Sequence, residues 1–509
     1  MRMTNKIMQT NSLYNINQTK IQEDKYNTQM TSQSKITRPS DDPVVAIRAL
    51  RLRSNVSTAT QYYKKNTPDA NQWLDVTAKS LDTITKVYTD LYKQVDTAVN
   101  KDYTASDINV LLTQIESYTN EVYATGNQDY AGRYIFTGYR TDTPLTLQKE
   151  QINSTDKTPD YTITENIKAA QLDSFSYTDY SVFDTVATAS GADELDITNA
   201  QIHRIRLTYD SIKDTSIPSL TIMDKDGNDV TSTVLGASIT IATSAQTAYQ
   251  DMTNAENTDP VTTKAIFVPS TGELLLSSDI ALKMSDTFTD GGQMSVTYEK
   301  NEWDVGDLNP QHYFRTEDNK THIVYNADGN VDTQITYDVG YNQTIQVNTN
   351  AYEVFDPAVA RDLDDLKKVA EDFTNIEKIR KDLEDELKGY VEGTANYKNC
   401  QTRLDAANKA YTYIRDAVSK RFGDQITRYQ SYLDSTNVAI TKNGTRSTRL
   451  ELIGARLEEQ MATFKELQED NEGIDISEVA IQLTSAEMTY DAALMATSKI
   501  MQNNLMNYI

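Results

Sequence analysis

The spacing of apolar residues along this chain changes from helical to strand-like and back to helical. Apolar residues recur at helical spacing from about residue 39 to residue 123 and again after Pro357, whereas residues 132–355 form short extended runs separated by glycine-containing turns. Two helical regions on either side of a β-rich insertion should make the two chain ends neighbours. We predict an α+β fold, in which the terminal helices form an elongated coiled-coil or helical-bundle stalk with an inserted β-rich domain.

The first 34 residues predict a weak helix. They are rich in amides and hydroxyls, and their apolar residues are thinly spaced at Met3, Ile7, Tyr14 and Ile21. An isolated helix of this composition is marginal in water, because its intrinsic propensity is poor and its apolar stripe is narrow. We therefore expect this helix to need a partner.

The stretch RPSDDPVVAIRAL, residues 38–50, predicts a helix start or hinge. The residues concerned are Pro39, Ser40, Asp41, Asp42 and Pro43. Ser40 is the expected N-cap, the two aspartates complement the positive end of a helix, and the second proline suits the first turn.

The helix that follows should bury an apolar stripe. The stripe runs through Val44, Ile47, Leu50, Trp73, Leu74, Leu81, Ile84, Tyr88, Leu91 and Val95. Because proline removes a backbone donor from a helix, we expect a kink at Pro68.

The last helix carries apolar residues to the end of the sequence. It begins near residue 476, with Asp475 or Ser477 as its cap. Its stripe comprises Ile476, Val479, Leu483, Tyr490, Leu494, Met501, Leu505 and Tyr508. The arc is widened by Ile481, Met488, Met495 and Ile509.

That arc is too wide for the polar N-terminal helix to cover alone. Insertion into a membrane is excluded by the charges of Glu487, Asp491 and Lys499 within the segment. Other subunits remain as the cover, so the stripes of the first and last helices predict an assembly interface and a homo-oligomer.

Composition excludes several other classes of partner. Lys and Arg total 49 against 74 for Asp and Glu, and the resulting net charge of -25 repels nucleic acid. No apolar run approaches the roughly 20 residues that span a bilayer. The single cysteine, Cys400, cannot form a disulfide within the chain.

Motifs for catalysis or metal binding are missing from the sequence. The histidines, His203, His312 and His322, do not stand at metal-ligand spacing. The segment DKDGND faintly resembles a calcium loop, but the twelfth position holds Leu235 instead of glutamate. We predict no enzyme activity, no cofactor and no metal; the open alternative is a β insert that binds or hydrolyses glycans.

Several stretches resemble a known family. They are MRMTNKIM, RPSDDPVVAIRAL, AGRYIFTGY followed by RTDTP, ITYDVGYNQTIQVN, RLELIGARLEEQ and AALMATSKIM. Together they resemble the bacterial flagellar hook-associated protein 3 family, whose members form the hook–filament junction and are related to flagellin. Flagellin itself shares the terminal helices and is the structural alternative.

The resemblance implies an arrangement in layers. Residues 1–38 with 473–509 would form the inner terminal helices, residues 39–145 with 356–472 the helical stalk, and residues 146–355 the outer β-rich domain. It also implies another hook-associated protein on the hook side, flagellin on the filament side and an export chaperone at the C-terminal helix. Family members are extracellular and leave the cell through the flagellar type III apparatus without a cleaved signal peptide. The large acidic insert departs from the family pattern.

Overall fold

A computed structural model of the chain describes residues 5–99, 103–152, 158–185, 195, 197–214, 217–236, 238–258 and 263–502. The chain divides into two compact units. The first comprises Met1–Asn71, Tyr337–Ile345 and Ser447–Ile509, and the second comprises Gln72–Thr336 and Gln346–Arg446.

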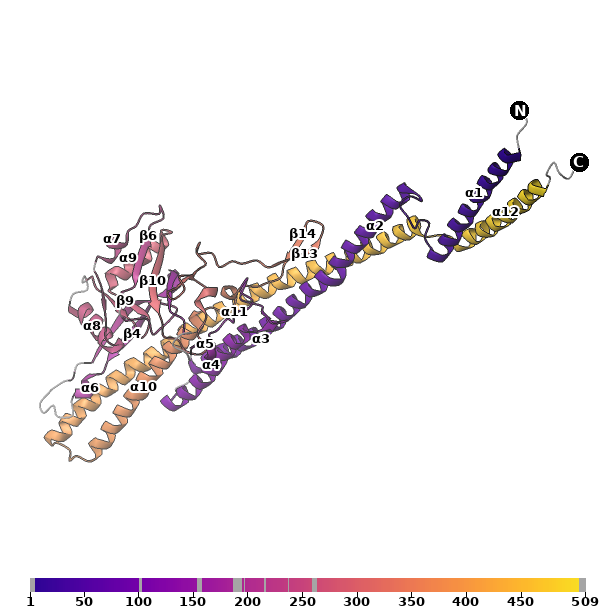
Figure 1. Cartoon of the computed structure of the whole chain (residues 1–509). Coiled ribbons are helices and arrows are strands. Elements are labelled where there is room, and N and C mark those ends of the chain that lie inside the picture. Colours follow the sequence, from indigo (N-terminus) through magenta and orange to yellow (C-terminus); the bar gives the residue numbers. More distant parts are fainter. Residues whose placement is uncertain are drawn as a thin grey trace, which may run out of the picture. The chain divides into compact units, whose positions relative to one another are not determined.

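The first unit brings together the two terminal helices and a second pair of helices. It contains α1 (Asn5–Ser32), α2 (Pro43–Gln61), the π-helical turn η1 (Tyr62–Asn66), the end of α11 (Ala395–Glu472) and α12 (Ile476–Gln502). The helices α1 and α12 lie side by side (Figure 1). In the segment after α1, the Lys35 N–H donates to the carbonyl of Glu472, the last residue of α11, at 2.7 Å.

The start of α2 differs from the prediction in its capping residue. Asp42 is the N-cap, because its Oδ1 accepts from the N–H groups of Val44 and Val45 at 2.9 and 3.1 Å. The expectation that Ser40 caps the helix was wrong. Since Pro43 occupies the first helical position, the cap must be the residue directly before it.

The buried face of α2 also differs from the prediction. Val44, Ile47 and Leu50 are exposed by 60, 58 and 68 %, whereas Ala46 and Ala49 are buried. The expectation that the early stripe is buried was therefore wrong for α2.

Ion pairs and hydrogen bonds attach α2 to the end of α11. Arg53 pairs with Glu472, with Nε 3.0 Å from Oε1, and the Asn471 amide donates to the Val45 carbonyl at 3.2 Å.

The irregularity expected at Pro68 is the π-helical turn η1, which ends two residues before the proline. The Thr67 N–H donates to the Tyr62 carbonyl, five residues back, so the helix widens by one residue just before the proline. The Asn66 side chain in this turn donates to the Asp338 carbonyl at 2.7 Å. That carbonyl belongs to the hairpin of β13 (Thr336–Gly340) and β14 (Gln343–Gln346).

The second unit contains a helical part with a large apolar core. It is built from α3 (Thr67–Val99), α4 (Ala105–Gly126), α10 (Ala358–Lys388) and most of α11, and α4 packs against α10. The predicted stripe from Trp73 to Val95 is confirmed in α3, where Leu81, Ile84 and Leu91 have no exposed surface. These residues recur at helical spacing, so one face of α3 is buried along its length.

The β-rich insert contains two five-stranded sheets among the described residues. One has the order β12-β11-β3-β10-β6 and is antiparallel, and the other has the order β4-β5-β9-β8-β7, with β7 parallel to β8. The strands are β3 (Tyr161–Ile167), β4 (Leu172–Asp179), β5 (Thr198–Arg206), β6 (Ser219–Met223), β7 (Ile239–Ile241), β8 (Ala265–Val268), β9 (Glu273–Leu276), β10 (Gln293–Lys300), β11 (Arg315–Asp318) and β12 (Val324–Tyr325). One apolar core, with Ile163 and Val296 from the first sheet and Ile205 and Leu274 from the second, joins the two.

Helices and short elements complete this unit. They are β1 (Asp129–Tyr130), β2 (Arg133–Tyr134), α5 (Lys149–Ile152), η2 (Ala169–Gln171), α6 (Val182–Thr185), α7 (Thr231–Leu235), α8 (Ala245–Thr258), α9 (Ser278–Thr289), η3 (Pro310–His312) and η4 (Ala351–Glu353). The helices α8 and α9 are not predicted by the sequence pattern. Ala248, Tyr249 and Met252 of α8 pack on Ile266 and Leu275 of the second sheet.

The predicted fold class is confirmed: along the sequence, long helices precede and follow a β-rich middle region.

Candidate assembly interface on the terminal helices

The face that α1 turns toward α12 is mostly polar. The partly or fully buried residues of α1 are Gln9, Ser12, Ile16, Thr19, Glu23, Tyr26 and Gln29. Ile16 is the most deeply buried of them, with 9 % of its surface exposed. A pair held by so few apolar contacts has little stability of its own.

The predicted stripe of α1 lies outside this pairing face. Ile7, Tyr14 and Ile21 are exposed by 50, 63 and 60 %. Met3 lies outside the described residues. The helix α12 of the same chain therefore leaves the stripe of α1 open to solvent.

The predicted stripe of α12 is divided between two faces. Val479 is buried, and Leu483 and Tyr490 are partly buried. Ile476 and Leu494 are exposed by 51 and 41 %. Met501 lies in the last turn of α12, while Leu505 and Tyr508 lie outside the described residues.

A second row of large apolar residues on α12 is more exposed than the predicted one. Ile481, Met488 and Met495 are exposed by 71, 64 and 67 %. They are seven residues apart, as are Ile7, Tyr14 and Ile21 on α1. From the sequence, this row was expected only to widen the apolar arc of the last helix. Its regular seven-residue spacing is the signal that marks it as a row of its own. We call these two sets the α1 row and the α12 row.

A shallow groove accompanies the α12 row. It has a volume of about 620 Å³ and is lined by Ala480, Ile481, Thr484, Ser485, Met488, Thr489 and Ala492. Small side chains beside large apolar ones give the surface that accepts side chains of a neighbouring helix.

Charges of both signs lie next to the two rows. Lys6, Lys20, Lys25 and Asp24 are exposed beside the α1 row, and Glu478, Glu487, Asp491 and Lys499 are exposed beside the α12 row. Lysines outnumber acids beside the α1 row and acids outnumber lysines beside the α12 row, which favours an encounter between the two surfaces.

The helix-start residues fix the turn that joins α1 to α2. Pro39 and Ser40 are exposed, and Asp41 accepts from the N–H groups of Arg38 and Thr37 at 2.9 and 3.1 Å. Those backbone hydrogen bonds lower the pKa of Asp41. With Asp42 as the cap of α2, this turn has a defined hydrogen-bond pattern.

The residues considered for chemistry do not form a site. The His312 Nε2 lies 3.2 Å from the Pro144 carbonyl oxygen, and burial lowers the pKa of this histidine to about 4. Cys400 is buried, and Asp224 accepts from the Asp226 and Asn228 N–H groups in a turn. Within the part of the chain that the structure describes, no group of three or more potential metal ligands occurs.

The second unit has a cavity of about 690 Å³ next to the first turn of α10. Arg206, Arg361 and Arg428 line it, and each is already paired with a carboxylate. The charges of these arginines are therefore balanced by acids of the same unit.

Comparison with known proteins agrees with the resemblance. Residues 3–141 match the model of the bacterial flagellin N-terminal helical region. Flagellar hook-associated protein 3 of Escherichia coli strain K12 is 28 % identical over 151 residues, which are 29 % of this chain and 47 % of that protein. Over somewhat more than a quarter of its length, this chain is similar to flagellar hook-associated protein 3.

Flagellar hook-associated protein 3 of Salmonella typhimurium is 27 % identical over 143 residues, which are 28 % of this chain and 45 % of that protein. The chain thus spans about half the length of the curated relatives it matches. A solved structure described as a candidate flagellar hook-associated protein of Vibrio parahaemolyticus is 12 % identical, covers 85 % of this chain and all of its own, and has a TM-score of 0.35. Among the described helices, none combines the length and the hydropathy needed to cross a membrane.

Proposed function

We propose that this chain is a structural subunit of the bacterial flagellum that joins the hook to the filament. The observation that carries the proposal is the pair of exposed rows on α1 and α12, which the described part of the chain leaves uncovered. The similarity to hook-associated protein 3 supports the flagellar setting. In this role the chain assembles with copies of itself and is not an enzyme.

The two rows give assembly its driving force. Full burial of a large apolar side chain stabilises by roughly 1.5–3 kcal/mol, so the six residues of both rows represent about 10 kcal/mol before the costs of association. Those costs are of similar size, so contact between two copies is favourable only where many contacts form together. A ring or helical array of copies meets that condition.

The partner of the α12 row is the α1 row of a second copy. Both rows repeat every seven residues, and the lysines beside one meet the acids beside the other. The α12 groove provides room for the aromatic ring of Tyr14 among its small side chains.

Further partners follow from the proposed position. Another hook-associated protein would contact the hook side of the ring, flagellin would contact the filament side, and an export chaperone would cover the C-terminal helix before assembly. The chain would be extracellular and exported without a cleaved signal peptide.

Replacing the α12 row tests this function in the bacterium that encodes the chain. Deleting the gene should leave hooks without filaments. A gene with Ile481→Glu and Met488→Glu should still give secreted protein but should not restore filaments, because two charges would then occupy the interface.

The matched control is Val438→Glu with Ile440→Glu, which introduces the same two charges at exposed apolar positions of α11, outside both rows. We expect this control to restore filaments at least partly. Full motility of the Ile481→Glu, Met488→Glu strain would refute the assigned interface. Long filaments formed by the purified chain alone would instead identify a filament subunit.

A further inference from the structure

The β-rich insert meets the helices of its own unit through buried charges. Strand β5 supplies Arg204 and Arg206, β4 supplies Asp173, and β9 supplies Glu273. From the helices come Asp362 and Asp365 of α10 and Arg421 and Arg428 of α11. We call these eight residues the insert joint.

Arginines of the insert bind acids of α10. The Asp365 Oδ2 lies 2.6 Å from both Arg204 Nη2 and Arg206 Nη1, and the second nitrogen of Arg206 lies 2.5 Å from Asp362 Oδ1. Asp362 has no exposed surface, and the side chains of Arg204 and Arg206 are exposed by 3 and 6 %. These pairs are therefore largely shielded from water.

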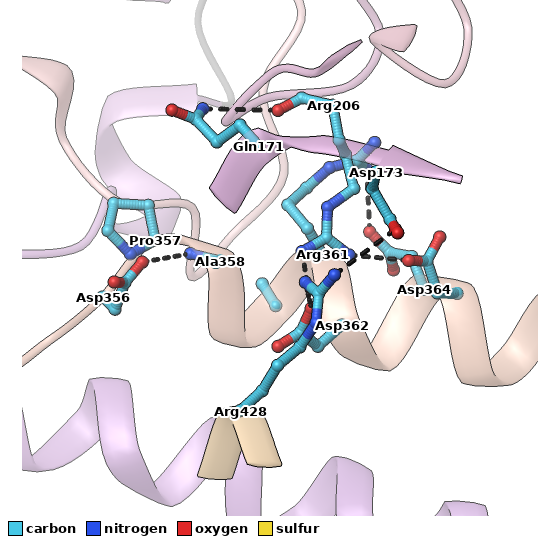
Figure 2. Close-up of polar contacts among 12 residues, drawn as sticks. Gln171, Asp173, Arg206, Asp356, Pro357, Ala358, Arg361, Asp362, Asp364 and Arg428 are labelled. Carbon is cyan, nitrogen blue, oxygen red and sulfur yellow. Dashed lines mark hydrogen bonds and ion pairs between the residues drawn. The ribbon is translucent and has the colours of Figure 1, made fainter. Parts of the chain in front are cut away.

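In the complementary pairs, an acid of the insert binds arginines of α11. Asp173 of the insert lies 3.1 Å from Arg421 Nη1 and 3.3 Å from Arg428 Nη2. Arg428 also reaches Asp362 at 2.7 Å, so one arginine contacts an acid from each side of the joint. Figure 2 shows Arg206, Arg428 and Asp173 together with Asp362 at α10.

Neighbouring groups hold the joint in place. Glu273 pairs with Arg204 and accepts from the Tyr249 hydroxyl at 2.5 Å. Tyr432 of α11 donates to Asp362 Oδ2 at 2.7 Å. The Arg204 guanidinium lies 4.8 Å from the centre of the Phe175 ring.

The electrostatics of the acids agree with this geometry. Burial alone would raise the pKa of Asp173, but Arg204, Arg421 and Arg428 outweigh burial and lower it to about 2. Burial likewise opposes the arginines at Asp365, whose pKa they hold far below its usual range. Both acids are charged under neutral conditions.

The joint is neutral as a whole, and each side is neutral by itself. The insert supplies two positive and two negative groups, and so do the helices. A shifted position of the insert would leave several of these charges buried without partners, which is costly. The alternation of signs therefore selects one position.

We propose that the insert joint is a coupling device that fixes the insert in one orientation on α10 and α11, so that the insert and these helices move as one body. In this reading the charges determine orientation, and the apolar cores of the two parts supply most of the stability. Loss of one central charge would release the orientation while both cores remain folded.

Distances between spin labels test this proposal directly. Labels are placed at Lys225→Cys, in an exposed turn of the insert, and at Val438→Cys on α11, which is 55 % exposed. The buried Cys400 is replaced by serine in all variants. The parent chain should give one narrow distance distribution, and Asp365→Asn should give a distribution at least twice as broad or a second population.

The matched control is Asp385→Asn, in the last turn of α10. Its side chain is 61 % exposed and pairs with Lys388 of the same helix. We expect this control to keep the narrow distribution of the parent.

Circular dichroism establishes that each variant is folded, and if Asp365→Asn does not fold, Asp173→Asn takes its place. A folded joint variant with the parent's distribution would overturn the proposal. So would equal broadening in the Asp385→Asn control.

Discussion

Asp42 determines where α2 begins. Its carboxylate accepts two of the N–H groups that the start of a helix leaves without intrahelical partners. Ser40 is equally suited by residue type, yet it lies two positions too early. Cap preference therefore identifies the segment in which a helix starts, and the position of the proline identifies the residue.

Asp42→Ala should destabilise the first turn of α2 by about 1 kcal/mol. Hydrogen exchange of the amides that follow Pro43 should then become roughly fivefold faster. Ser40→Ala is the control, and we expect it to leave exchange in that turn unchanged. Equal acceleration by the two variants would contradict the assignment of Asp42 as the cap.

Because of Asp173, the insert joint should lose stability at acidic pH. The pKa of Asp173 falls from an ordinary value of 3.8 to about 2, because nearby arginines outweigh the effect of burial. Since the pKa is lower in the folded chain, its stabilisation is complete above about pH 4 and is lost as the pH falls toward 2. The difference represents roughly 2 kcal/mol.

Urea unfolding across this pH range measures the effect. Asp173→Asn should be less stable than the parent at neutral pH and should lose less stability on acidification. A parent and a variant that respond identically to acid would contradict the lowered pKa of Asp173.

At the scale of elements, α2 presents a buried row of alanines on one face and an exposed row of larger residues on another. The sequence pattern predicted the opposite, because hydropathy ranks Val44, Ile47 and Leu50 above Ala46 and Ala49. Close contact between helices depends on small volume as well as on hydropathy. The three-residue spacing of the alanines was a usable signal for this face.

Ala49→Leu should destabilise the chain by about 1–3 kcal/mol, because the added atoms have no room at a buried position. Ile47→Ala should change the stability of the monomer by less than about 0.5 kcal/mol, since its side chain is mostly exposed. Chemical unfolding followed through helical circular dichroism measures both variants. A larger loss for Ile47→Ala than for Ala49→Leu would contradict the assigned faces.

The terminal helices could be located from the sequence, but their faces could not. Spacing alone located the two helices and predicted Ile7, Tyr14 and Ile21 as a row. Spacing could not predict that α12 would pack against the polar face of α1, which includes Ile16 and Thr19. That choice depends on which side chains the other helix offers, and no local pattern contains this information.

At the scale of the whole molecule, the change of apolar spacing from helical to strand-like and back to helical predicted the fold class correctly. The helices α8 and α9 were missed because they are short and lie inside a threonine-rich, strand-like region. The insert joint was missed as well, since its acids and arginines lie more than 150 residues apart in sequence at several contacts. The three-layer division of the chain stays a prediction.

The polar contact between α1 and α12 has a consequence for where this molecule becomes ordered. In the proposed assembly, neighbouring copies would cover the two rows and add to the stability of this helix pair, so its stability would rise with the local concentration of copies. The pair would then respond to how many copies surround it. In dilute solution the pair would have only its own few apolar contacts, whereas closely packed copies would supply the rest.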